Sequence, residues 1–284
     1  MCGRYAASAN ADELIEVFDI DVDASAEPAR SLLVNPQSPP AGHPDFNMAP
    51  TKQAHVVLTR SPRSPRTEKP AGEDGEATRQ LRLLTWGLVP SWSKDPRSGV
   101  RMINARSETL LASRAFAPAA RSRRCLVPAR GWYEWQASPV AKDAKGKPRK
   151  QPFFIESGTG ETIAFAGLYE FWRDPGVESG ADPSAWLTTF TIITTAADPG
   201  LDRIHDRQPL VLEPAAWDAW LDPSRTDEGE VADLLTFAEP GRFRAYPVSR
   251  AVSSNRSNGA GLLEPIGLEE LEGVLDPTTG EILG

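Results

Sequence analysis

Short apolar runs separated by polar stretches rich in Pro and Gly restrict the fold of this chain more than any other feature of its sequence. Most of the runs are rich in Val, Ile, Leu, Phe and Thr, residue types that favour extended structure. We therefore expect strands over residues 54–59, 81–88, 123–127, 152–156, 162–168, 187–195 and 208–212.

Helical patterns are fewer than strand patterns. Residues 11–18 place apolar side chains at helical spacing after Asn10 or Asp12 as a cap, and a short strand precedes this helix. Further helices are expected over 107–120, 214–221 and 229–237. Because strands outnumber helices and do not alternate regularly with them, the pattern predicts an α+β fold with a mainly antiparallel sheet.

The 284 residues are expected to form a single compact domain. A hydrophobic content of 40% is enough to bury a substantial core, and no long linker divides the chain. The stretch 60–79 is polar and rich in Pro and Gly, so burial cannot offset the entropy lost on ordering it, and we expect a flexible loop there. Residues 138–150, which are strongly basic, and 173–184 are similar, and the first is expected to form the tip of a hairpin.

The chain begins without a basic segment followed by an apolar stretch, and nowhere do about 18 apolar residues run together. We therefore expect a cytosolic protein that makes no membrane contact. Cys2 and Cys125 are too few for a disulfide framework or a zinc site, and His43, His55 and His205 lack the paired short spacings of metal ligands. No metal and no cofactor are expected.

The net charge of −8 and the pI near 5.1 argue against a general nucleic-acid coat, because phosphate binding depends mainly on Lys and Arg. The charges are unevenly distributed along the sequence, however. Asp and Glu crowd residues 68–76 and 222–233. Arginines gather around the candidate site segments, as Arg4, Arg101, Arg106, Arg114, Arg121, Arg123 and Arg124. A local basic groove on an acidic protein is compatible with this distribution.

Cys2 is the first candidate for chemistry. Removal of Met1 before a small residue is sterically easy, and it leaves an α-amine with a reference pKa of about 7.7 to 8 beside a thiol of about 8.5. An aldehyde that meets this pair forms an imine with the amine, and addition of the thiol to the same carbon closes a five-membered thiazolidine. Gly3 allows close approach of a ligand, and Arg4 can pair with a phosphate. The alternative is a buried small hydrophobic residue in a first strand.

Asn104 and Arg106 lie in a second candidate segment, residues 102–109. The Asn104 amide can hydrogen-bond a substrate, and the planar guanidinium of Arg106 suits a phosphate. The alternative is that Asn104 caps a helix while Arg106 and Glu108 lie in solvent on its first turns. On this segment alone we favour the helix cap.

Glu134 is a carboxylate inside an aromatic run, Trp132-Tyr133-Glu134-Trp135, that follows a turn at Gly131. An apolar wall raises the pKa of a carboxyl group toward neutrality, which allows the group to act as a general acid. The alternative is an alternating strand in which Glu134 points at solvent. Cys125, a few residues earlier, is expected to belong to the core.

His205 lies in the last candidate segment, together with Thr195 and Arg207. The threonine hydroxyl and the guanidinium suit phosphate contacts, and a His side chain, which titrates near neutral pH, suits proton transfer. A single His in a loop is more often a satisfied surface group, and Asp206 can simply pair with Arg203 or Arg207.

Seven segments carry, in order, the motifs of a known family. They are Met1-Cys2-Gly3-Arg4-Tyr5, Asn47-Met48-Ala49-Pro50, Trp86-Gly87-Leu88-Val89-Pro90, Ile103-Asn104-Ala105-Arg106-Ser107-Glu108-Thr109, Gly131-Trp132-Tyr133-Glu134-Trp135, Ile204-His205-Asp206-Arg207-Gln208-Pro209-Leu210 and Pro247-Val248-Ser249-Arg250-Ala251-Val252. On these motifs the chain resembles the SRAP family, the SOS-response-associated peptidases, whose bacterial and eukaryotic members crosslink to abasic DNA. The resemblance defines a domain over residues 2–266, with the loop 60–79 as an insertion and 267–284 as a C-terminal tail.

The resemblance implies roles for the candidate residues. Cys2 would form the thiazolidine with the aldehyde of an abasic site, after the protein has removed its own Met1. Asn104 would orient the opened sugar, and Glu134 and His205 would act as an acid–base pair. The residues that we expect to contact DNA are Arg4, Trp92, Arg106, Thr195 and Arg207.

The resemblance also implies a fold and a set of partners. The family fold is a compact mixed domain with a barrel-like β core, short flanking helices and a positively charged cleft. The implied activity is a lyase-like crosslinking reaction that protects abasic sites in single-stranded DNA during the DNA damage response. We expect a cytoplasmic monomer that associates with the nucleoid on damaged DNA, with the replication machinery as a further candidate partner.

Trp92 follows residues 86–91, which resemble a strand ending in a turn that presents an aromatic side chain. It can stack on a base, a contact worth about 1 to 3 kcal/mol in single strands, or it can anchor the core. Family members often carry two adjacent tryptophans here, whereas this chain has Ser93 after Trp92. Wedging of bases by a second ring is therefore not expected.

The main rival interpretation is an N-terminal-nucleophile hydrolase, in which Cys2 attacks an amide carbonyl with its own α-amine as base. That enzyme needs a peptide cleft and an oxyanion hole, whereas an aldehyde trap on DNA needs Arg side chains directed at phosphates. The arginines near Cys2, Asn104 and His205 favour DNA. A reader of DNA or histone marks, built on an aromatic cage from the run 132–135, leaves Cys2 unexplained.

Overall fold

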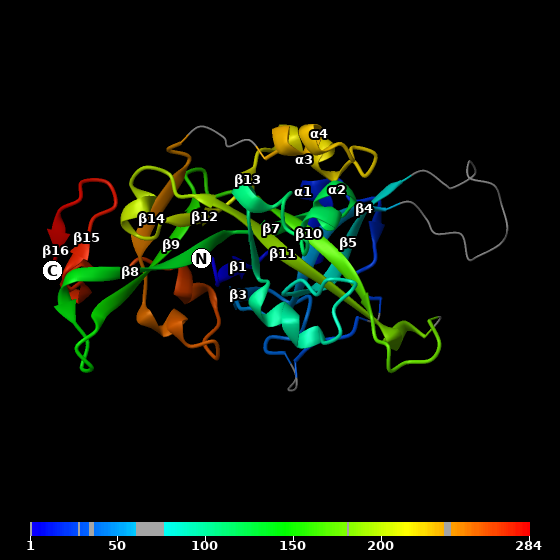
Figure 1. Cartoon of the computed structure of the whole chain (residues 1–284). Coiled ribbons are helices and arrows are strands. Elements are labelled where there is room, and N and C mark those ends of the chain that lie inside the picture. Colours follow the sequence, from blue (N-terminus) through cyan, green and yellow to red (C-terminus); the bar gives the residue numbers. More distant parts are fainter. Residues whose placement is uncertain (1, 28, 34–36, 61–76, 181, 236–239) are drawn as a thin grey trace.

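Two β-sheets form the framework of the protein (Figure 1). The structure is a computed structural model that describes residues 2–27, 29–33, 37–60, 77–180, 182–235 and 240–284. The central strands of the larger sheet are β4 (Gln53–Arg60), β5 (Thr78–Trp86), β7 (Arg124–Ala129), β10 (Ile163–Arg173) and β11 (Trp186–Ala196).

These five central strands close into a barrel. They follow the order β11-β10-β7-β4-β5 through antiparallel pairs, and a parallel pairing of β5 with β11 joins the two ends. At this junction Trp86 lies opposite Phe190. Closure removes the free sheet edges whose unpaired backbone groups favour association with other strands. The expected barrel-like, mainly antiparallel core is confirmed.

The smaller sheet is antiparallel and carries the N-terminal strand. Its order is β14-β9-β8-β1-β3. Its strands are β1 (Tyr5–Ala7), β3 (Asp45–Met48), β8 (Gly131–Lys142), β9 (Pro148–Ser157) and β14 (Phe243–Pro247). Tyr5 lies opposite Trp132, so the residues before Tyr5 run alongside the aromatic run of β8. Gly131 allows β8 to lie close to β9 at this point, because a Cβ atom there would lie 2.4 Å from the Ile155 carbonyl oxygen.

The remaining elements are shorter, and among the described strands β15 and β16 pair only with each other. The remaining strands are β2 (Val22–Asp23), β6 (Asn104–Arg106), β12 (Arg207–Pro209), β13 (Val211–Leu212), β15 (Val274–Leu275) and β16 (Ile282–Leu283). The 3-10 helices are η1 (Pro96–Arg101), η2 (Ser107–Thr109), η3 (Pro183–Ala185), η4 (Leu201–Arg203), η5 (Arg250–Ser253), η6 (Ala260–Leu263) and η7 (Leu268–Glu270). Because β6 pairs in parallel with β11 and β12 pairs antiparallel with it, two candidate site segments lie beside one strand.

The α-helices are short and lie on the barrel (Figure 1). α1 (Ala11–Phe18) has the expected bounds, and Asn10 caps it through a reciprocal pair of hydrogen bonds with Glu13, both 3.0 Å long. α3 (Pro214–Leu221) also has the expected bounds. α4 (Glu228–Asp233) covers the first part of the helix expected over 229–237, whose end falls outside the described residues.

The single helix expected over residues 107–120 is wrong. The chain instead forms η2 and then α2 (Ala117–Ser122). Pro118 explains the interruption, because proline lacks an N–H group and its ring clashes with the carbonyl four residues earlier in a continuous helix. In the first turn of α2 neither penalty applies, so the helix begins just before Pro118.

The core lies on both sides of the barrel strands, since successive side chains point in opposite directions. Val56 faces one cluster, which includes Trp86, Trp132 and Phe165 and lies between the barrel and the smaller sheet. Val57 faces a second cluster under the helices. Each fully buried side chain of this size stabilises the fold by about 1.5 to 3 kcal/mol relative to an exposed one.

The expected strands are all present with shifted ends, and the run 208–212 divides into β12 and β13. The loop expected over 60–79 falls largely on residues 61–76, which lie outside the described residues, while Thr78 and Arg79 belong to β5. The tail over 267–284 carries the β15–β16 hairpin, which lies beside β8 (Figure 1). Among the described residues, no helix combines the length and apolar character needed to cross a membrane.

Candidate functional site

One cavity gathers residues from four distant segments of the sequence. Its volume is about 530 Å³. The residues that line it are Arg106, Glu134, Trp135, Lys150, His205, Asp206 and Arg207. They come from β6, β8, β9 and the turn that leads into β12, so both sheets contribute. Three of the segments singled out in the sequence therefore meet in one place.

Glu134 lies on β8 with only 3% of its surface exposed. Its neighbours Trp132 and Tyr133 are fully buried. Burial raises the pKa of Glu134 to about 7, and the Asp206 carboxylate acts in the same direction. The expected rise in the pKa of Glu134 is confirmed, although its cavity is lined mainly by charged side chains, and the alternative in which Glu134 points at solvent is wrong.

His205 follows η4 and is partly buried. Its Nδ1 accepts a hydrogen bond from the Arg207 backbone N–H at 3.1 Å and lies 3.0 Å from Asp206 Oδ1. Burial lowers the pKa of His205, which favours the uncharged ring with Nδ1 as acceptor at neutral pH. The alternative that Asp206 pairs with Arg203 or Arg207 is wrong. The Arg207 guanidinium binds Glu108, and the Arg203 guanidinium binds backbone carbonyl oxygens.

Asn104 begins strand β6 opposite Ile192 of β11, so the helix-cap interpretation is wrong. Its Nδ2 donates a hydrogen bond to the Cys2 carbonyl oxygen at 2.7 Å. Its Oδ1 is buried and accepts no hydrogen bond from the described residues. A buried acceptor without a partner costs free energy, so Asn104 is well suited to accept a hydrogen bond from a ligand.

Cys2 is fully buried beside this asparagine, and its Sγ lies 3.9 Å from the Arg4 carbonyl oxygen. Burial raises the pKa of the Cys2 thiol well above its usual range, and the charge of Glu134 raises it further. The thiol is therefore protonated at neutral pH. Cys125 is buried in the core of the barrel, as expected.

Arg106 and Arg207 both reach the cavity but differ in their partners. The Arg207 guanidinium forms two hydrogen bonds with the Glu108 carboxylate, at 2.6 and 3.0 Å, and another with the Thr194 carbonyl oxygen at 2.7 Å. Arg106 is exposed, and among the described residues it has neither a hydrogen-bond nor an ion-pair partner for its side chain. Arg106 is therefore available to a ligand anion, whereas Arg207 is already neutralised.

Arg4 is tied into the fold. Its Nη1 donates to Asn47 Oδ1 at 2.7 Å and to the Val252 carbonyl oxygen at 3.0 Å. Asn47 in turn donates to the carbonyl oxygens of Val252, Ser254 and Ser257. These bonds give the motifs at 47–50 and 247–252 a physical role, because they hold the N-terminal strand in place.

Thr195 and Trp92 are not among the residues that line the cavity. Thr195 is buried on β11 with 4% exposure. Trp92 is 52% exposed and the Arg114 guanidinium lies 4.8 Å from its ring centroid, so Trp92 does not anchor the core.

The expected arginine cluster does not form one groove. Arg121 pairs with Glu228, and Arg123 pairs with Glu170 at 2.9 Å. Arg124 is buried and donates to backbone carbonyls, including that of Trp220 at 2.7 Å. These side chains hold α2, α3 and α4 on the barrel. They follow the site segment in the sequence but do not line the cavity.

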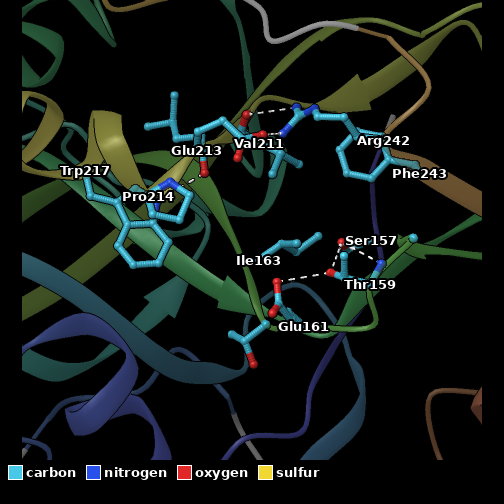
Figure 2. Close-up of a pocket in the computed structure, with 13 residues that line it drawn as sticks. Ser157, Thr159, Glu161, Ile163, Val211, Glu213, Pro214, Trp217, Arg242 and Phe243 are labelled. Carbon is cyan, nitrogen blue, oxygen red and sulfur yellow. Dashed lines mark hydrogen bonds and ion pairs between the residues drawn. The ribbon is translucent and has the colours of Figure 1, made fainter.

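A second cavity, of about 340 Å³, contains none of the candidate residues (Figure 2). Ser157 and Thr159 form one side, and α3 with Trp217 forms another. The one arginine among its described lining residues, Arg242, is paired with Glu213. This cavity holds no histidine and no unpaired arginine among those residues, whereas the cavity at Glu134 holds His205 and Arg106, so we assign the candidate site to the cavity at Glu134.

Lys150 is a cavity residue that sequence reasoning missed. It lies at the start of β9, opposite Ala137 of β8, and its charge lowers the pKa of both Glu134 and His205. The signal available in the sequence was the basic run 138–150, which we interpreted only as a hairpin tip. No group of three or more His, Cys, Asp and Glu residues within the described ranges has an arrangement that could hold a metal ion.

The sequence model of the family described as SOS response associated peptidase (SRAP) matches residues 1–255. The chain belongs to the SRAP family. Abasic site processing protein YoqW of Bacillus subtilis is 35% identical over 266 residues, which cover 93% of this chain and 99% of that protein. Abasic site processing protein YedK of Escherichia coli is 32% identical, and the match covers 94% of this chain and 100% of YedK. Abasic site processing protein HMCES of Gallus gallus is 31% identical, and the match covers 79% of this SRAP chain and 67% of HMCES.

Solved structures share the fold of this chain. A crystal structure of a protein from Bacteroides thetaiotaomicron matches with a TM-score of 0.64 at 21% identity, covering 93% of this chain and all of that one. A crystal structure of a phage-related protein from Bordetella bronchiseptica matches with a TM-score of 0.54 at 27% identity, covering 88% and 95%.

Proposed function

We propose that this SRAP protein captures abasic sites in single-stranded DNA as a covalent thiazolidine on Cys2, and that the link protects the site during the DNA damage response. The observation that carries the proposal is the cavity in which Arg106, Glu134 and His205 meet, close to the Cys2 backbone that Asn104 holds. The substrate is supported by relatives named abasic site processing proteins, which match over 93% and 94% of this chain.

The reaction loses one water. The α-amine of Cys2, free once Met1 has been removed, attacks the aldehyde carbon, and the resulting hydroxyl leaves as water to give a C=N bond. A bond from Cys2 Sγ to the same carbon then closes the ring, and the thiol proton replaces the one that Glu134 gave to the departing water. The proposal includes self-removal of Met1, which the family's description as peptidases supports.

Three side chains share the proton transfers and positioning. Glu134, with a pKa of about 7, donates a proton to the departing hydroxyl and, when the ring reopens, to the departing sulfur. Neutral His205 assists opening of the closed sugar, because only the open aldehyde reacts. The buried Asn104 Oδ1 accepts a hydrogen bond from the opened sugar and so orients it.

Arg106 is the principal phosphate contact in this proposal, because no described side chain neutralises it. Arg4 and Arg207 contribute through N–H groups that their internal partners leave open. Trp92 stacks on a base and Thr195 contributes a hydroxyl. Single-stranded DNA as substrate, the replication machinery as a further partner and a monomeric state belong to the same proposal.

Intact mass spectrometry after incubation with an abasic single-stranded oligonucleotide tests the proposal. The expected species is the protein without Met1, plus the oligonucleotide, minus one water. Cys2→Ser should leave at most a hydrolysable imine, and an oligonucleotide whose abasic site has been reduced to the alcohol should give no adduct. The mechanism is wrong if protein with a blocked α-amine forms the stable adduct at the normal rate.

The rival hydrolase shares the nucleophile but needs it as a thiolate. Burial opposes that state, because it raises the pKa of the Cys2 thiol. Imine formation starts at the amine and does not require a thiolate, which favours the aldehyde trap. Hydrolysis of peptides by the protein without Met1, in the absence of any DNA adduct, would support the rival.

A further inference from the structure

A buried glutamine links the strand that carries Glu134 to the turn that carries His205. Gln136 lies two residues after Glu134 on β8, so both side chains are on the same face of the strand. Only 1% of Gln136 is exposed. Its Nε2 donates to the carbonyl oxygens of Arg203, at 3.2 Å, and Leu275, at 2.9 Å, and its Oε1 accepts from the Leu275 N–H at 2.7 Å.

The turn that receives this bond leads directly to His205. Arg203 is the last residue of η4, and the His205 backbone N–H donates to the carbonyl oxygen of Leu201, the first residue of η4, at 3.0 Å. A displacement of the Arg203 carbonyl therefore moves the imidazole. Gln136 itself is on β8, beside Glu134. Its hydrogen bond to the Arg203 carbonyl therefore fixes the position of His205 relative to Glu134.

The C-terminal hairpin, β15–β16, also contacts both Arg203 and β8. Arg203 Nη1 donates to the carbonyl oxygens of Pro277, at 2.6 Å, and Thr278, at 3.0 Å. The hairpin also lies close to β8, because a Cβ atom at Gly273 would lie 2.7 Å from Ser138 Oγ. This hairpin lies beyond residue 255, where the family match ends.

We propose that Gln136 is a positioning residue for the capture reaction. Its hydrogen bonds hold the turn 201–205, and they thereby fix the position of His205 relative to Glu134. The C-terminal hairpin supports Gln136 and the turn. The inference rests on the proposed function for its effect on rate. The link itself rests on the contacts of Gln136 and does not depend on the substrate.

The charged groups around His205 come from several elements. They are Asp206 on its own turn, Glu134 on β8, Lys150 on β9, Arg106 on β6 and Arg207 on β12. Gln136 carries no charge. A change in the His205 pKa on replacing Gln136 therefore reports a movement of the imidazole relative to these groups and to solvent.

The test uses Gln136→Met, which preserves the length of the side chain and removes its hydrogen bonds. Gln53→Met is the matched control. Gln53 is a buried glutamine on β4 with 8% exposure, and its Nε2 donates to the carbonyl oxygens of Ala29 and Arg30, both at 3.3 Å, away from the cavity. Arg203→Met is a second variant, which loosens the hairpin while leaving Gln136 in place.

The first measurement is an NMR titration of the His205 ring without DNA. Release of the turn should expose the ring and raise its pKa toward the ordinary value in Gln136→Met, and to a smaller extent in Arg203→Met, but not in Gln53→Met. The second is adduct formation at increasing abasic oligonucleotide. Gln136→Met should lower the maximal rate about tenfold or more, with an unchanged half-saturating concentration.

An unchanged His205 titration in Gln136→Met overturns the proposal, as does a maximal rate equal to that of wild type. If Gln136→Met does not fold, an unchanged titration in Arg203→Met has the same meaning. Equal slowing of Gln136→Met and Gln53→Met shows a general loss of stability and also overturns it. If wild type forms no adduct with abasic DNA, the proposed function fails, while the titration still decides the link.

Discussion

Replacing Glu134 by Gln tests the raised pKa of this carboxyl without any assumption about a substrate. In the folded protein the pKa is about 7, against an ordinary value of 4.5. Between these two values the folded state holds a proton that the unfolded chain has released. Wild-type stability therefore falls as pH rises through this window, because the folded state increasingly has to bury a carboxylate.

The structure gives the size of the effect. Glu134 is 3% exposed, so screening by solvent is small. The interval from 4.5 to about 7 corresponds to about 3 kcal/mol, at 1.36 kcal/mol for each pKa unit. The amide introduced by Glu134→Gln is neutral at every pH and resembles the protonated carboxyl in shape. The free energy of unfolding of Glu134→Gln should thus match wild type near pH 4.5 and exceed it by about 3 kcal/mol above pH 7.

Urea unfolding between pH 4.5 and 8 measures this difference. The lowered pKa of His205 makes its own contribution, which is lost as pH falls, but that contribution is common to both proteins and largely cancels in the difference. Glu16→Gln on the exposed face of α1 is the control, since it removes one carboxylate without any burial. A difference between Glu134→Gln and wild type that does not change with pH would refute the raised pKa, and with it the role of Glu134 as an acid near neutrality.

Three further outcomes follow from the surroundings of individual side chains. Arg106→Ala should reduce the slope of log affinity against log salt for undamaged single strands by about 0.7, and Arg121→Ala should leave the slope unchanged. If Arg106→Ala and wild type have equal slopes, Arg106 does not contact a phosphate. Trp92→Ala should weaken the same binding by about 1 to 3 kcal/mol in a fluorescence titration, with a melting temperature close to wild type, and unchanged affinity would contradict stacking. His205→Ala should slow adduct formation on gels by about 10²-fold or more without loss of strand affinity, so a wild-type rate would return His205 to a structural role.

The features predicted correctly from the sequence depend on neighbouring residues. The reciprocal cap between Asn10 and Glu13 is set within four residues, and α3 begins at Pro214, where proline tolerates a helix start. The raised pKa of Glu134 was predictable for a similar reason, because its neighbours Trp132 and Tyr133 on β8 are aromatic and buried, and Glu134 is buried with them.

Features that depend on distant pairing could not be predicted. The parallel junction of β5 and β11 closes the barrel, yet each strand has the same local pattern as its antiparallel neighbours. Asn104 resembles a helix cap in sequence, and only the pairing of β6 with β11 makes it a strand residue beside Cys2. Likewise, Arg121 and Arg123 follow the site segment in the sequence but pair with Glu228 and Glu170. Gln136 carried no signal because its partners come from two segments far along the chain.

The protonation states of three groups determine an order for the proposed capture. The thiol of Cys2 holds its proton because it is buried, whereas an α-amine, with a reference pKa of about 7.7 to 8, is partly free at neutral pH. The amine therefore attacks first, and Glu134 supplies the proton that releases water. Glu134 is then a carboxylate, and its charge opposes ionisation of the nearby thiol.

Transfer of the thiol proton to Glu134 removes that opposition, because the carboxylate is neutralised as the thiolate forms. The sulfur can then attack the carbon of the protonated imine, whose nitrogen has kept its hydrogen, and Glu134 holds a proton again as it did at the start. A carboxyl with an ordinary pKa would lack the proton for the first step at neutral pH. One with a much higher pKa would be too weak an acid to release water, so a value near 7 allows a single buried side chain to serve both steps.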